Sequence, residues 1–197
     1  MTNENPASRF AAMLEVRARK LGEWRERRVA AGSEVFQPQA ENVPVFILTA
    51  GLVKLYYPVA NGEEWTKSYI ADHGVFGPTS IEAPIMQFGA RAIEDCCLGT
   101  MRLTWLAGQL GEDAALVGAL GQFQAWLFER KRQREEDLLC RAAEERYLAF
   151  VEGETALTAR LEQQEIAAYL RVTPVALSRI RRRLKQQGRL SAGASSP

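Results

Sequence analysis

The chain has 197 residues, of which 47% are hydrophobic and 25% are charged, and its formal net charge is +1. These values are typical of a folded globular protein and exclude global disorder. No apolar run reaches the ~18 residues that a membrane-spanning helix needs, and the first 30 residues contain no signal-peptide-like apolar segment. The sequence therefore predicts a cytoplasmic protein that does not contact a membrane.

The charges are unevenly distributed along the chain. Residues 166–197 contain seven of the 25 Lys and Arg residues and none of the 24 Asp and Glu residues, the last of which is Glu165. A basic segment joined to an acidic remainder indicates a local anion-binding surface.

The N-terminal half predicts one helix followed by many short strands. Residues 8–27 are expected to be helical because their apolar residues share one face: Phe10, Met13, Leu14 and Leu21. From about residue 28 to 106, runs such as "VFILTA", "LVKLYYPV" and "GTMRLTWL" alternate with turn sequences, which predicts an antiparallel β-roll of the jelly-roll kind. Between two of these runs, Asn61-Gly62 predicts a two-residue type I′ hairpin turn.

Residues 111–142 predict a long helix, or two helices in succession. The apolar positions follow a heptad-like spacing: Leu116, Leu120, Phe123, Leu127, Leu138 and Ala142. A helix that leaves a small β domain cannot bury such a stripe alone, so we expect it to pack on the sheet and on a second copy of itself. An intramolecular core helix is the alternative.

The C-terminal part predicts helices at 143–153, 162–170 and 174–187. The last two are separated by the three residues "RVT". Thr173 is a suitable N-cap, Pro174 suits the first helical position, and Gly188 suits a left-handed C-terminal cap. Two short helices joined in this way predict a helix-turn-helix, whose second helix enters the major groove of DNA.

In this hypothesis Ile166, Ala167, Leu170, Leu177, Ile180 and Leu184 pack between the two helices. The candidate DNA-binding residues lie elsewhere on them: Gln164, Thr173, Pro174, Val175, Ala176, Ser178, Arg179, Arg182 and Arg183. A solvated basic face on an ordinary helical hairpin is the alternative. The absence of carboxylates over 32 residues favours DNA, because solvated basic helices usually carry acidic partners one turn away.

The segment "QQEIAAYLRVTPVALSRIRRRL" resembles the helix-turn-helix of Crp/Fnr-type bacterial transcription regulators. The segments "VFILTAGLVKLYY", "VFGP" and "AIEDCCLGTM" also fall in the order of that family's cyclic-nucleotide-binding β-roll. The resemblance implies an α+β fold with three parts. These are a sensor domain with an N-terminal helix at 1–110, a dimerisation helix at 111–142, and a winged-helix/helix-turn-helix domain at 143–197. It implies a homodimer on an inverted repeat in double-stranded DNA, and leaves RNA polymerase open as a further partner.

The resemblance also locates a candidate effector pocket: Phe76, Gly77, Pro78, Thr79, Met86, Gln87 and Arg91. The family's cyclic-nucleotide binders carry a Glu after the Phe-Gly pair and an Arg-Ser/Thr pair for the phosphate. Pro78 and the pair Met86-Gln87 occupy these positions here, so we predict no tight binding of cAMP or cGMP. The direction of Arg91, and whether a small-molecule effector exists, stay open.

Two further departures concern the DNA-binding residues. The turn position that is often Gly in the family is Arg171, and Arg costs ~1 kcal/mol more than Gly if φ is positive there. Pro174 and Val175 stand where the best-studied relatives carry Arg and Glu. The operator sequence of those relatives therefore cannot be transferred to this chain.

Other functions have weaker support in the sequence. Cys96, Cys97 and Cys140 have no CxxC spacing, so buried structural cysteines are favoured over an iron–sulfur cluster or a zinc site. His73 is the only histidine and suits a turn better than haem ligation, although haem sensing stays open. We find no nucleophile–base spacing and predict that the protein is not an enzyme. The alternative function is a small-molecule-binding signalling module whose basic C-terminus contacts a protein or membrane surface.

Overall fold

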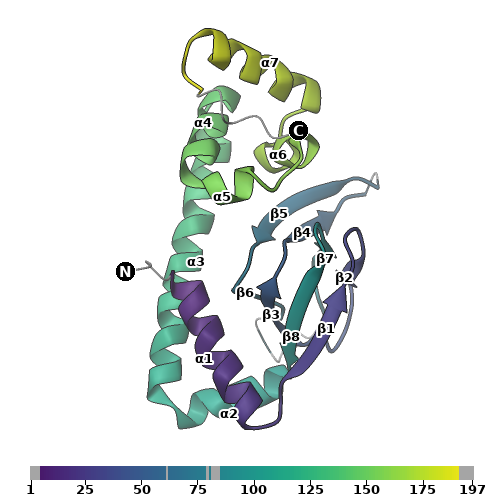
Figure 1. Ribbon diagram of the computed structural model, residues 1–197, viewed down its shortest axis with the longest axis vertical. Helices are drawn as coiled ribbons and strands as arrows, with labels where there is room; N and C mark the ends of the chain where they lie inside the picture. Colours follow the sequence, from purple (N-terminus) through teal and green to yellow (C-terminus); the bar gives the residue numbers. More distant parts are fainter. Residues whose placement is uncertain (1–4, 61, 79, 81–84, 191–197) are drawn as a thin grey trace. The chain divides into compact units, whose positions relative to one another are not determined.

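The computed structural model describes residues 5–60, 62–78, 80 and 85–190 (Figure 1). The chain divides into two compact units, Met1–Glu129 and Arg130–Pro197, and the division falls within one long helix. The three-part organisation expected from the sequence is a finer division and stays a prediction.

The first unit is built on two four-stranded antiparallel sheets. One has the strand order β1 (Arg25–Val29), β8 (Cys96–Met101), β3 (Val45–Ala50) and β6 (Gly74–Phe76). The other has the order β2 (Glu34–Phe36), β7 (Gly89–Ala92), β4 (Val53–Pro58) and β5 (Glu64–Ile70). This arrangement confirms the predicted α+β fold with an antiparallel roll.

An apolar core lies between the two sheets. The rings of Phe46 and Phe76 stack with centroids 5.0 Å apart, and Phe36 stacks on Phe46 at 5.7 Å. Leu48 and Leu98 from neighbouring strands are fully buried in the same cluster. The roll interior is therefore packed with the chain's own aromatic and aliphatic side chains.

A second apolar cluster covers the other face of the β3–β8 sheet. Helix α1 (Pro6–Lys20) contributes Phe10 and Leu14, and strand β3 contributes Ile47. The ring of Phe10 also stacks on Phe123 of the long helix, with centroids 5.5 Å apart. Helix α1 and the beginning of the long helix thus form one layer against the sheet.

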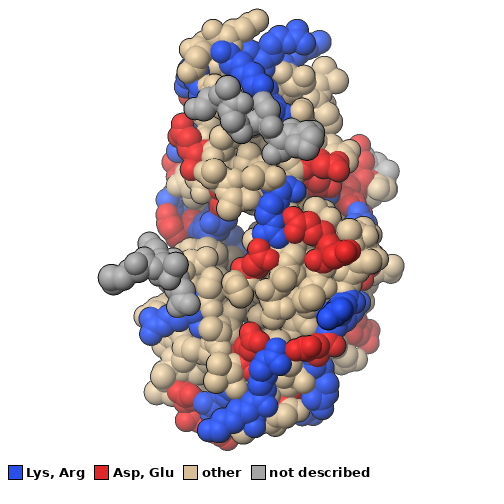
Figure 2. Space-filling view, in the orientation of Figure 1, with Lys and Arg blue, Asp and Glu red and all other residues tan. Residues whose placement is uncertain are grey.

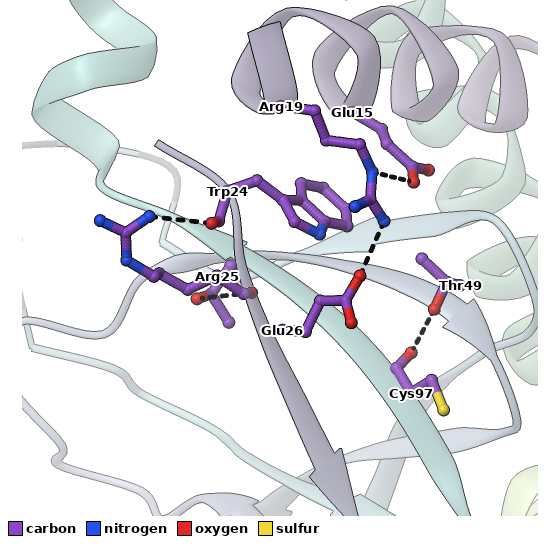
Figure 3. A network of polar contacts seen from close by, with 8 residues as sticks. Glu15, Arg19, Trp24, Arg25, Glu26, Thr49 and Cys97 are labelled. Atoms are coloured by element: carbon purple, nitrogen blue, oxygen red, sulfur yellow. Dashed lines mark hydrogen bonds and ion pairs between the residues drawn. The ribbon is translucent and has the colours of Figure 1, made fainter. Parts of the chain in front are cut away.

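Trp24 anchors the chain between α1 and β1 (Figure 3). Its indole occupies the space left by Gly99, where a Cβ atom would lie only 1.8 Å from the ring. The Arg19 guanidinium lies 4.6 Å from the centre of that ring and donates to Glu15 at 2.8 Å and to Glu26 at 2.9 Å. These contacts hold the end of α1 against the first strand.

The remaining elements are helical. In the first unit, α2 (Leu103–Glu112) is followed by α3 (Ala114–Cys140), which continues into the second unit. Asp113 separates them and caps α3 by accepting the backbone N–H groups of Ala115 and Leu116 at 2.9 and 3.2 Å. The second unit adds α4 (Ala143–Gly153), α5 (Thr155–Thr158), α6 (Gln163–Leu170) and α7 (Pro174–Gln186). Residues 191–197, the end of the predicted winged-helix/helix-turn-helix domain, lie outside the described residues.

The predicted ends of several elements were wrong. The first helix ends at Lys20, and residues 25–29 form strand β1. Because β1 is an edge strand with four exposed residues out of five, it lacks the apolar alternation that marks a strand. In the run "GTMRLTWL", strand β8 ends at Met101. The last four residues, "LTWL", were predicted as strand but form the first turn of helix α2. Ala142, placed on the long helix by its spacing, is the N-cap of α4.

The β4–β5 hairpin forms where Asn61-Gly62 predicted it, but with a longer loop. Val59 N–H donates to the Glu63 carbonyl at 3.0 Å, and Gly62 N–H donates to the Val59 carbonyl at 2.9 Å. Gly62 has φ 82°, so it follows the turn in the left-handed conformation, as in three-residue hairpin loops. Asn61 itself lies outside the described residues.

Candidate functional site

The two helices of the predicted motif have the expected bounds and caps. The Thr173 hydroxyl accepts the Ala176 N–H at 3.1 Å, and Pro174 is the first residue of α7. At the other end, Gly188 has φ 65° and Arg189 N–H donates to the Leu184 carbonyl at 3.0 Å. This is the glycine-ended termination expected from the sequence.

The turn between α6 and α7 depends on Arg171. This residue has φ 58° and ψ 46°, so the position does require the left-handed conformation. Val172 N–H donates to the Ala167 carbonyl at 3.0 Å, which closes the end of α6. The Arg146 guanidinium donates to the Leu170 carbonyl at 3.2 Å and ties α4 to the same turn. These hydrogen bonds offset the ~1 kcal/mol cost of a non-glycine residue there.

The apolar sides of α6 and α7 are buried as predicted. Ala167 is fully buried where the helices approach, and so are Leu177 and Leu184 of α7. Tyr147 and Phe150 of α4 are also buried in the second unit. Because one side of α7 is buried, the orientation of its opposite side toward solvent is fixed.

The candidate DNA-binding residues lie on that solvent side. Seven of the nine are on or next to α7 and are exposed: Thr173, Pro174, Val175, Ser178, Arg179, Arg182 and Arg183; Gln164 of α6 is exposed too, and Ala176 is half-buried. Val175, Arg179 and Arg182 follow one another at helical spacing and share one face with Ser178. Figure 2 shows Lys and Arg side chains gathered over this helix.

The basic residues of this region differ in their ionic partners. Arg183 forms an ion pair with Glu144 of α4, and Arg189 donates to the same carboxylate at 3.2 Å. In the part of the chain that the structure describes, the side chains of Arg179 and Arg182 have no ion pair or hydrogen bond. No local sequence pattern indicates the Glu144 contact, because Glu144 is 39 residues away from Arg183.

Phe76 and Met86 of the candidate effector pocket belong to the core of the roll. The Phe76 ring is stacked on Phe46, and Met86 is only 3% exposed. Gly77 is also buried, with φ 133°, and a Cβ atom there would lie 2.8 Å from the Pro44 carbonyl oxygen. At the surface, Pro78 is half-buried and Gln87 is exposed. The remaining candidate, Thr79, lies outside the described residues.

Arg91 points away from these residues. Its neighbours Ala90 and Ala92 are fully buried in the roll core, so the alternation of the strand directs Arg91 to the opposite face. The guanidinium donates to Glu64 at 2.6 and 2.8 Å and to Glu34 at 2.6 Å. Hydrogen bonds to Glu64 and Glu34 raise the pKa of Arg91 above its ordinary value.

Tyr56 completes this cluster on the outer face of the sheet. Its hydroxyl donates to Glu34 at 3.1 Å, and its ring lies 4.9 Å below the Arg91 guanidinium. Burial, and then the negative charge of Glu34, raise the pKa of Tyr56 to about 12. The candidate effector residues are therefore divided between an apolar core and a surface ion-pair cluster, and Arg91 is neutralised by two carboxylates.

The cysteines and the histidine have separate positions. Cys96 is buried, whereas Cys97 and Cys140 are exposed, so the prediction of buried cysteines was correct for one of three. His73 is an exposed turn residue with φ 64°, as the sequence favoured. Among the described residues, no three His, Cys, Asp or Glu side chains come together as metal ligands would. The helices described here are all too short or too polar to cross a bilayer.

Comparison with known proteins gives both a sequence relative and a shared fold. No family model matches the chain. The nitrogen fixation regulation protein FixK of Azorhizobium caulinodans is 25% identical over 181 residues, which cover 84% of this chain and 71% of that protein. Together with the helix-turn-helix motif and the roll described above, this similarity agrees with the resemblance to Crp/Fnr-type regulators found in the sequence.

Solved structures share the fold of this chain along most of its length. FixK2 from Bradyrhizobium japonicum superposes with a TM-score of 0.78 at 20% identity, covering 87% of this chain and 89% of that one. A CooA mutant from Carboxydothermus hydrogenoformans has a TM-score of 0.72, also at 20% identity, and covers 95% of this chain and 87% of its own. At such identities the likeness extends to the fold alone.

Proposed function

We propose that this protein is a cytoplasmic transcription regulator of the Crp/Fnr type that binds double-stranded DNA through α6 and α7, and that it is not an enzyme. The observation that carries the proposal is the outward face of α7. Arg179 and Arg182 are exposed there, and neither is paired with another described residue. Arg side chains in this state can bind phosphate oxygens or the edge of a guanine. The name of FixK, a regulation protein, is consistent with this role.

The active form in this proposal is a homodimer. Helix α3 exposes large apolar side chains in the first unit, with Val117 47% and Phe128 70% exposed. A second copy of the helix would remove this surface from water. Two-fold symmetry would then present two α7 helices to successive major grooves, ~34 Å apart, on an inverted repeat.

The roll in this proposal does not bind cyclic nucleotides tightly. The position that holds a phosphate-binding Arg in the family's nucleotide binders is Met86, which is buried among apolar side chains. Arg91, the candidate replacement, is already bound by Glu34 and Glu64. A bound cyclic phosphate would have to compete with two carboxylates for that charge, which opposes binding. Isothermal titration with cAMP and cGMP tests this, and micromolar affinity would contradict it.

The proposal is tested by fluorescence anisotropy with a random 30-base-pair duplex at several salt concentrations. Each Lys or Arg that neutralises a phosphate adds about 0.9 to the slope of log affinity against log salt. We expect salt-dependent binding at micromolar protein and a slope that falls by about one in the Arg182→Ala variant. The matched control is Arg28→Ala, which removes an exposed arginine of strand β1 and should leave the slope unchanged. Absence of salt-dependent binding by the natural protein would contradict the proposal.

A further inference from the structure

The first turn of α7 presents an apolar surface to solvent. Val175 is 62% exposed, and Pro174 before it is exposed as well. Val175 lies on the same helical face as Arg179, four residues later, and Arg182, seven residues later. A largely exposed, branched apolar side chain thus stands at the head of an otherwise polar stripe.

Resting on the proposed function, we infer that Val175 contacts the C5-methyl group of a thymine in the major groove of each half-site. Valine has no donor or acceptor, so it cannot read the hydrogen-bonding edges of the other bases. The thymine methyl is the apolar group that the major groove presents, and small apolar side chains are its usual partners. Val175 would therefore supply a preference for thymine at one position.

The neighbouring residues determine where this thymine falls. Arg179 lies one helical turn after Val175, ~6 Å further along the helix axis, and a guanidinium can bind both O6 and N7 of guanine. Stacked bases are ~3.4 Å apart along the DNA axis. The thymine and the guanine are therefore expected within about two base-pair steps of each other in the half-site.

The test removes single methyl groups from the DNA. Bound duplexes are first selected from a random library, and each thymine of the half-site is then replaced in turn by 2′-deoxyuridine, which lacks only the methyl. Affinity is measured by fluorescence anisotropy for the natural protein and for Val175→Ala. At one thymine per half-site, we expect deoxyuridine to weaken binding of the natural protein about fourfold, or ~0.8 kcal/mol. Val175→Ala, whose side chain is shorter by two methyl groups, should show a smaller difference between the two duplexes.

The matched control is Val16→Ala, because Val16 is a comparably exposed valine on α1. This variant should respond to deoxyuridine as the natural protein does. If every thymine gives the same response in the natural protein and in Val175→Ala, the inference is wrong while the proposed function stands. If no duplex is enriched and none is bound, the proposed function fails, and this inference fails with it.

Discussion

Two arginines of the protein lie in opposite electrostatic environments: Arg91 on strand β7 and Arg179 on helix α7. Arg91 is half-buried and bound by Glu34 and Glu64, whereas Arg179 is exposed and has no ionic partner in the described chain. The Arg91 guanidinium is occupied by these two carboxylates and therefore stabilises the sheet instead of binding an external anion. The Arg179 guanidinium keeps its charge available for an external anion. The number of basic residues therefore says less about function than the carboxylates around each of them.

The largest effect on DNA binding is expected from Arg179→Ala, which removes the available guanidinium. If Arg179 holds a guanine, its loss weakens binding to a selected operator by about 1–3 kcal/mol and relaxes the preference at one position. Protein stability should not change, because the side chain has no partner in the described chain to lose. Quantitative footprinting and urea unfolding measure the two effects. An unchanged footprint would remove Arg179 from the site.

Arg91→Ala should have the reverse signature. It leaves the carboxylates of Glu34 and Glu64 facing each other without a cation, so we expect a loss of about 2 kcal/mol in the free energy of unfolding. Intrinsic DNA affinity per folded protein should not change. Restoring stability by adding Glu34→Gln and Glu64→Gln would confirm the cause. A stable Arg91→Ala protein would contradict the structural role.

Glu144→Gln tests the same effect of neighbouring carboxylates within the second unit. Glu144 holds Arg183 and Arg189, so its neutralisation should make both available to phosphates. We expect binding to random duplex to strengthen about fivefold at low salt, with a salt slope that rises by about one per released arginine. Anisotropy at several salt concentrations measures both quantities.

The matched control for this variant is Glu152→Gln. Glu152 is an exposed residue of the same helix, and within the described chain its side chain has no ionic partner. It changes the net charge by the same amount but should alter affinity much less. Equal effects of the two variants would show that only the overall charge matters, and would rule out a specific role for Glu144.

The smallest expected effect concerns pH and a third arginine, Arg102, at the start of α2. Its guanidinium and backbone N–H both donate to Glu23, and these bonds lower the pKa of Glu23 to about 2. A lowered carboxyl pKa contributes stability above the ordinary value of about 4.5 and loses it as the pH falls toward 2. Because Arg102 is largely exposed, we expect the contribution to be about 1 kcal/mol or less.

Urea unfolding of the natural protein and Glu23→Gln at pH 6 and pH 3 checks this expectation. The difference in stability between the two proteins should be present at pH 6 and should shrink at pH 3. A difference that is the same at both pH values would mean that the Glu23 carboxylate contributes nothing through its charge.

Much of the helix-turn-helix could be predicted from the sequence because its signals are local. Thr173, Pro174 and Gly188 determine the ends of α7 through backbone geometry within a few residues. The three-residue turn and the buried Leu177 and Leu184 follow from helical periodicity. Local rules failed at strand β1, since an exposed edge strand of charged residues carries no periodic signal.

The parts of the site that escaped prediction depend on contacts between distant residues. Arg91 meets Glu34 and Glu64 only because strands β2, β7, β4 and β5 assemble into one sheet. Arg183 meets Glu144 only when α4 and α7 fold together. The sequence therefore identified the basic residues, but it could not distinguish those held by carboxylates from those left available.

The proposed function requires that a dimer of this chain binds DNA with the outward face of α7. Selection of bound duplexes from a random library by the full-length natural protein can show this binding. We expect an enriched inverted repeat whose half-sites are centred one helical turn, ~10 base pairs, apart, each with a guanine and a nearby thymine. Recovery of no sequence preference, or of a single unrepeated site, would contradict it.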